Sequence, residues 1–75
     1  MKLRLTKQDL GKRCITAAET SMNDYEKNRY NQTSGSYLEA ARSNLIIAER
    51  HGVNIEIQRR RLQTLHRDYM SQIDN

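Results

Sequence analysis

The chain has 75 residues, of which 36% are hydrophobic and 29% charged, and 13 lysines and arginines against 9 aspartates and glutamates leave a formal net charge of +4. A second hydrophobic core cannot be built at this length, so we expect one small domain. Because Phe and Trp are absent, a core of Leu, Ile, Ala and Met would bury little area per residue. We therefore expect a homo-oligomer or a protein that depends on a partner.

The charge excess lies at one end. Within residues 1–13 the only anion is Asp9, whereas residues 14–75 carry equal numbers of cations and anions. We interpret residues 1–5 as a basic N-terminal arm and residues 6–75 as a single small helical domain. The longest apolar run, residues 45–48, is far too short to span a membrane, and polar residues follow Leu5 where a signal peptide would be apolar. Cytoplasmic location without membrane association is the expectation.

The spacing of apolar residues predicts an all-α fold with helices at about 7–30, 37–51 and 55–73. At the first start, Thr6 and Asp9 have the spacing of a capping box, and Leu5 can pack on Leu10 as a hydrophobic staple. An apolar stripe then runs from Leu10 through Cys14 to Tyr25. Gly11 weakens this helix, so its first turns should fray unless a neighbour covers them.

The second predicted helix begins with Ser36 and Glu39, three residues apart as in a capping box, which places Gly35 at the boundary before it. Gly52 suits the left-handed position just beyond a helix, and Val53 can then pack back on the last turn. So short a turn predicts that the second and third helices form an antiparallel αα-hairpin.

The third predicted helix begins with Asn54 as a cap and repeats apolar residues at coiled-coil spacing. Because only about two and a half heptads are present, this helix must pack on the second helix, on another subunit, or on both. The expected hairpin or oligomer seam consists of Leu38, Leu45, Leu62, Leu65 and Tyr69.

Residues that could carry out catalysis are sparse. No two of His51, His66 and Cys14 have the spacing of a metal site, and His66 and Asp68 point apart on a helix because they are two positions apart. We interpret His51 as a complement to a helix C-terminus and Cys14 as a small apolar residue. We therefore expect no enzymatic activity, no cofactor and no metal.

Two groups of residues could bind a ligand. Cations that could meet phosphates or an acidic partner are Lys2, Arg4, Lys12, Arg13, Arg59, Arg60 and Arg67, with Arg61 completing a run of three. The alternative interpretation of the run is a solvated face on which Glu56 pairs with Arg60. Tyr30, Ser34 and Tyr37 could form an interface or hold a nucleotide-like anion, although packing and helix-start roles explain them as well.

Three functional classes follow. The first is a non-enzymatic interaction protein that blocks or adapts a protein partner through helical faces; in size and composition the chain is similar to small accessory proteins of phages and plasmids. The second is a nucleic-acid-binding protein that uses the arm and the arginines of the third helix. The third is an oligomeric binder, or sponge, of a small anionic ligand. We favour the first class because it requires the fewest specialised residues.

Overall fold

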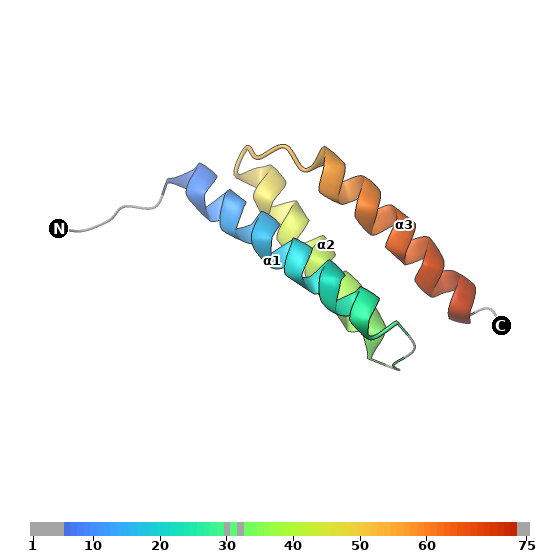
Figure 1. Ribbon diagram of the computed structural model, residues 1–75. Helices are drawn as coiled ribbons and strands as arrows, with labels where there is room; N and C mark the ends of the chain where they lie inside the picture. Colours follow the sequence, from blue (N-terminus) through green and yellow to red (C-terminus); the bar gives the residue numbers. More distant parts are fainter. Residues whose placement is uncertain (1–5, 30, 32, 74–75) are drawn as a thin grey trace.

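The computed structural model describes residues 6–29, 31 and 33–73, and these form three helices and no strand (Figure 1). The helices are α1 (Lys7–Lys27), α2 (Ser34–Arg50) and α3 (Glu56–Ile73). The expected all-α, three-helix fold is confirmed. The expected arm at residues 1–5, together with Tyr30, lies outside the described residues.

Both ends of α1 are set by local hydrogen bonds. The Thr6 hydroxyl accepts the Asp9 backbone N–H at 3.1 Å, and the Asp9 carboxylate accepts the Thr6 backbone N–H at 3.1 Å, so the predicted capping box is confirmed. The Thr6 backbone N–H and the Thr6 hydroxyl, which donates to the same carboxylate at 2.9 Å, lower the pKa of Asp9. At the other end, the Asn28 side chain donates to the Asp24 carbonyl at 2.8 Å, and α1 stops at Lys27 rather than at residue 30. The expected staple involves Leu5, which is outside the described residues.

The predicted start of α2 is wrong. Ser36 is not a cap: its hydroxyl donates to the Thr33 carbonyl at 2.6 Å, and its backbone N–H donates to the same oxygen at 3.1 Å. Helical hydrogen bonding therefore begins at Thr33, and α2 includes Ser34 and Gly35 within its first turn. Gly35 lies within the helix, and Tyr69 packs directly over the face on which a Cβ would lie.

The turn after α2 agrees with its prediction. Gly52 has a φ of +80°, the left-handed conformation that favours glycine. The Val53 backbone N–H returns to the Ala48 carbonyl at 3.1 Å, and the His51 ring Nδ1 lies 2.7 Å from the Ile47 carbonyl and donates to it. α3 begins at Glu56, whose backbone N–H donates to the Asn54 side chain at 3.0 Å, as expected of a capping asparagine.

Gly11 shows how the turn joins α1. This residue is buried, and a Cβ placed on it would meet the Val53 side chain and the His51 Cβ. The turn after α2 therefore covers Gly11, as the sequence required if the first turns of α1 were not to fray. The missing side chain lets the turn between α2 and α3 pack closely against α1.

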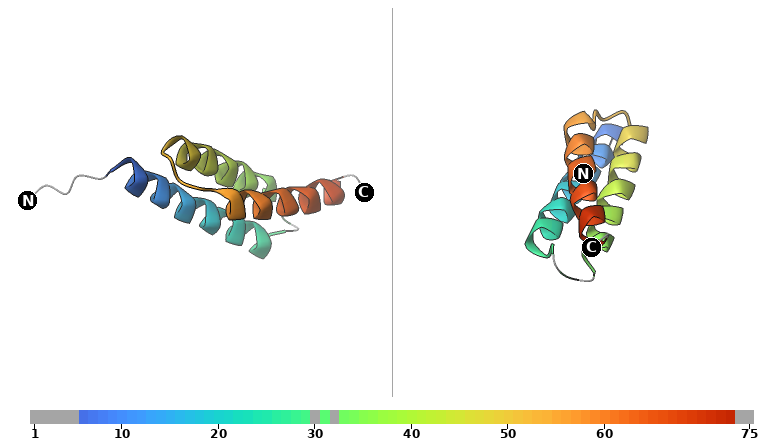
Figure 2. Two further views of the ribbon diagram at one scale, coloured as in Figure 1. Left: turned by 90° about the horizontal axis from the view of Figure 1, so that it is seen from above. Right: turned by 90° about the vertical axis from the view of Figure 1, so that its right-hand side faces the viewer.

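The core lies mainly between α1 and α2, which pack side by side along their lengths (Figures 1 and 2). Its buried members are Ala18, Met22, Tyr25, Leu38, Ala41, Leu45, Ala48, Ile55 and Leu65. From α3 itself only Leu65 is buried, because this helix lies against the pair more loosely than α1 and α2 lie against each other. A tight α2–α3 hairpin and a homo-oligomer stay predictions.

Candidate functional site

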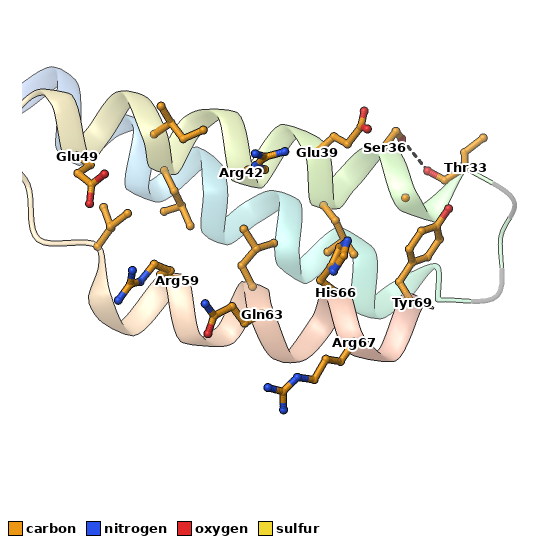
Figure 3. Close-up of a pocket in the computed structure, with 16 residues that line it drawn as sticks. Thr33, Ser36, Glu39, Arg42, Glu49, Arg59, Gln63, His66, Arg67 and Tyr69 are labelled. Carbon is orange, nitrogen blue, oxygen red and sulfur yellow. Dashed lines mark hydrogen bonds between the residues drawn. The ribbon is translucent and has the colours of Figure 1, made fainter. Parts of the chain in front are cut away.

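The loose seating of α3 leaves an open groove between α2 and α3, with a volume of about 1080 Å³ (Figure 3). Its floor is apolar. Leu38 and Leu45 are buried at the base of the α2 wall, and Ile55, Leu62 and Tyr69 line the α3 side. Ile46 stands at the rim with 38% of its surface exposed. Because Leu38, Leu45 and Ile55 are buried, the apolar surface that the groove leaves uncovered belongs to Ile46, Leu62 and Tyr69.

Charged side chains line the two rims of the groove. Glu39, Arg42 and Glu49 project from α2, and Arg59, His66 and Arg67 project from α3. None of the ion pairs between described residues crosses the groove. Arg59 instead binds Glu56 on its own helix at 2.7 Å. The rims therefore differ in sign, with two carboxylates on α2 and two guanidinium groups plus an imidazole on α3, while Arg42 is the one cation of the α2 rim.

Tyr69 closes one end of the groove and sets how near α3 approaches α2 there. Its ring packs over Gly35 so closely that a Cβ on the glycine would lie 2.6 Å from the Tyr69 hydroxyl oxygen. The same ring meets Tyr25 edge to face, with 6.3 Å between ring centroids and 79° between planes. Tyr69 therefore contacts all three helices, which explains why it is only half-buried yet well packed.

Asp68 ties α3 to the end of α1. Its carboxylate accepts hydrogen bonds from the Tyr25 hydroxyl at 2.8 Å, from the Arg29 guanidinium at 2.6 and 3.1 Å, and from the Gln72 amide at 3.1 Å. The bonds from Arg29 and Tyr25 lower the pKa of Asp68. Burial, with the bond to Asp68 second, raises the pKa of Tyr25 to about 12. Asp68 is thus an ionised structural anchor, and its carboxylate points away from His66, as expected.

A second polar tie lies one to two turns earlier. Arg61 donates to the Asn23 side chain at 2.7 Å and pairs with Glu26 at 3.0 Å, both on α1. Together with the Asp68 cluster, it holds α3 against α1 through polar contacts, while the α2 side of α3 stays open. Both polar ties of α3 therefore reach α1 or the residues just beyond it, and no ion pair between described residues joins α3 to α2.

The predicted cations fall in different places. Lys12 and Arg13 are exposed on α1, and Arg67 is exposed on the α3 rim. Arg60, like Arg59, pairs with Glu56, at 3.2 Å, which agrees with the solvated-face interpretation. Lys2 and Arg4 lie outside the described residues. Among the described cations, Lys12 and Arg13 thus lie on α1, and Arg59, Arg60 and Arg67 lie on α3.

The predicted ligand-binding residues and seam residues also differ in how far they are buried. Ser34 is buried, with 1% of its surface exposed, and Tyr37 is half-buried against the core, while Tyr30 is outside the described residues. Within the expected seam, Leu38, Leu45 and Leu65 are buried, whereas Leu62 and Tyr69 are only partly covered and face the groove. The partly covered seam residues are the ones that a further helix would bury.

Metal-binding groups, membrane spans and the cysteine can be assessed in the part of the chain that is described. No group of three His, Cys, Asp or Glu side chains there could hold a metal ion. None of the described helices has the length and apolar character to cross a membrane. Cys14 is a half-buried free thiol packed beside the core.

Sequence reasoning missed the groove rims and the Asp68 cluster. Arg42 and Glu49 each follow an apolar stripe residue of α2, Ala41 and Ala48. Helical periodicity therefore places both charged side chains beside the apolar stripe, and this signal could have identified them as rim residues. Asp68 meets partners 39 and 43 residues away, and no local pattern marks such a pair.

Comparison with known proteins gives no relative: no protein-family model, no curated protein and no solved structure matches this chain. The site itself defines the class, a small three-helix protein with an open interhelical groove.

Proposed function

We propose that this protein is a non-enzymatic interaction protein of the cytoplasm that binds a helix of a protein partner in the α2–α3 groove and so blocks or adapts that partner. The observation that supports the proposal is the apolar floor between two charged rims with no described ion pair across them. Grooves of this kind bind amphipathic helices, whose apolar face covers the floor while polar flanks meet the rims.

The size of the groove suits a helix. A helix about 10 Å in diameter that rises about 1.5 Å per residue occupies roughly 120 Å³ per residue. The groove volume of about 1080 Å³ therefore accommodates about nine residues, or two and a half turns. This length provides anchors at positions i, i+3 or i+4 and i+7, which is the usual pattern of helix-in-groove recognition.

The proposal includes two finer expectations. We propose that α2 and α3 act together as an αα-hairpin whose two helices bind the incoming helix as one surface. We also propose that the chain forms a homo-oligomer, because α3 leaves Leu62, Met70 and Ile73 partly or largely uncovered.

Two further functions rank lower. Nucleic-acid binding would use arginines that already have partners: Arg59 and Arg60 bind Glu56, and Arg61 binds α1. Binding of a small anion near Ser34 would require a hydroxyl that is buried. Binding that weakens steeply as salt rises would favour nucleic acid, and a nucleotide that raises the melting temperature would favour the small anion.

The experiment that tests the groove is affinity capture with a matched pair of variants. Ile46→Glu places a carboxylate at the groove rim, and Ile57→Glu makes the same change on the outer face of α3, where Ile57 is 80% exposed. We expect cross-linking and mass spectrometry to recover one stoichiometric protein with wild type and with Ile57→Glu. Ile46→Glu should lower its recovery at least about tenfold, since a buried charge without a partner opposes binding. Equal recovery with both variants would contradict the proposal.

A further inference from the structure

We infer that the groove is covered by a second copy of this chain, with two grooves packed face to face about a two-fold axis parallel to the helices. In this dimer, α2 of each copy lies on α3 of the other copy. The inference rests on the proposed function, because it identifies the polypeptide that covers the same groove.

The signs of the two rims support this occupant. A two-fold axis along the groove exchanges the walls, so the α2 rim with Glu39 and Glu49 faces the α3 rim with Arg67 and with Arg59, which also binds Glu56 of its own helix. Each copy therefore presents carboxylates to cations twice, once in each direction. A groove whose two walls had the same sign would repel its own copy.

The charged residues of opposite rims also lie at similar heights along the helix axes. A two-fold axis parallel to the helices leaves each residue at its own height, and the contact between Gly35 and Tyr69 gives a common origin for α2 and α3. At about 1.5 Å per residue, Glu39 lies about 6 Å from that origin, and His66 and Arg67 lie about 4.5 and 3 Å from it. Figure 3 shows Glu39 and Arg67 at the outer edges of their walls, and the exchange of walls brings these edges together.

The remaining rim residues fit the same arrangement. Glu49 lies about 21 Å and Arg59 about 15 Å from the origin, an offset that a long guanidinium side chain can cover. Arg42, the one cation of the α2 rim, lies about 10.5 Å along, between Gln63 at about 9 Å and Arg59 at about 15 Å. A glutamine carbonyl can accept a hydrogen bond from that guanidinium.

The available area is sufficient for a dimer. The 18 residues of α3 extend about 27 Å, and two helices side by side are about 20 Å wide. Each copy therefore offers about 540 Å² in projection, and the pair about 1,080 Å², which exceeds the roughly 1,000 Å² that a specific interface requires. Burial of Leu62 and Ile46 would provide the apolar centre of this interface.

The first test is the mass of the full chain in solution by light scattering at micromolar and near-millimolar concentrations. We expect a mass twice the 8.8 kDa of one chain. Added salt should promote dissociation of the dimer, because it screens the charge contacts between the rims. A mass of one chain throughout this range would overturn the inference, and so would a mass of three or more chains.

The second test uses charge reversal to read the orientation. Glu39→Lys alone and Arg67→Glu alone should each weaken the dimer about 10- to 100-fold, because both symmetric contacts become repulsive. A mixture of the two variants should dimerise again, since Lys at position 39 of one chain then faces Glu at position 67 of the other, and the wild-type pair is kept at the second contact. Recovery only on mixing cannot come from a contact within one chain.

The matched controls are Glu19→Lys and Lys7→Glu, the same reversals on exposed positions of α1. Both should dimerise like wild type, and circular dichroism should show wild-type helicity for all four variants. Dimerisation of either single rim variant at wild-type strength, or no heterodimer on mixing, would overturn the inference.

The two proposals fail separately. If the chain is a monomer but Ile46→Glu still abolishes partner capture, the groove binds a different protein and the dimer is wrong. If the mixing experiment succeeds and no other protein is captured, the dimer is correct and the partner-binding function is wrong.

Discussion

Replacing Gly35 with alanine tests whether Tyr69 rests on α2 in solution, which is the contact that sets one end of the groove. The new Cβ would lie 2.6 Å from the Tyr69 hydroxyl oxygen and 2.7 Å from Cζ. Because favourable contacts between non-bonded atoms lie at about 3.5–4.0 Å, the ring must withdraw by about 1 Å. The tyrosine would then lose part of its packing against α2 and against Tyr25.

Two opposing effects decide the size of the change. Overpacking of this kind costs about 1–3 kcal/mol, whereas alanine in place of glycine in a helix gains at most about 1 kcal/mol. Gly35→Ala should therefore lower the free energy of unfolding by up to about 2 kcal/mol, which corresponds to a fall in Tm of about 4–8 °C for each kcal/mol in a domain of this size.

The control is the same change in a chain that carries Tyr69→Ala. Without the ring, only the gain from helix propensity remains, so Gly35→Ala should then stabilise the protein by about 0.5–1 kcal/mol. Urea unfolding followed by far-ultraviolet circular dichroism measures all four members of this double-mutant cycle, and we expect a coupling of about 1–3 kcal/mol. An equal stabilisation in both backgrounds would refute the reasoning, because it would mean that Tyr69 does not contact Gly35.

Four other outcomes are expected. Leu65→Ala, which removes the one buried side chain of α3, should lower the free energy of unfolding by about 2–4 kcal/mol. Amide hydrogen exchange should become faster in α3 than in α1, and an equal increase in both helices would contradict this expectation. Asp68 has a lowered pKa, so its contribution to stability is present above its unfolded pKa of about 3.8 and is lost as pH falls through the lower folded value; Asp68→Asn should flatten this acid limb in unfolding titrations. Tyr25 has its pKa raised to about 12, so its contribution is full below the unfolded value of about 10 and is lost as pH rises toward 12, a limb that should be absent in Tyr25→Phe. Gly11→Ala should destabilise the protein by up to about 2 kcal/mol in thermal melts, because displacing Val53 costs more than the gain in helix propensity, and a stabilised variant would show that the turn does not contact α1.

The site was less accessible to sequence reasoning than the fold. Of the predicted binding residues, Leu62, Tyr69, Arg59 and Arg67 line the groove, and Leu38 and Leu45 lie at its base. Their residue types predicted a seam or a basic ridge. What places them around one open groove is the loose seating of α3, which depends on Asp68 and Arg61 meeting partners on another helix or beyond its end.

What the sequence determined by itself is local. The capping box of Thr6 and Asp9, the left-handed Gly52 and the cap at Asn54 each depend on residues two to four positions apart, so spacing was enough to predict them. Three helices and their apolar stripes follow from the same short periods.

Only the tertiary structure decided where α2 begins and which face of α3 stays open. Gly35 was expected at a helix boundary but lies in the first turn of α2, where Tyr69, 34 positions away in the chain, packs over it. Leu65 is buried while Leu62 faces the groove, although both repeat at seam spacing. The physical reason is that such contacts join segments far apart in sequence, and their outcome depends on how whole helices pack rather than on any local preference.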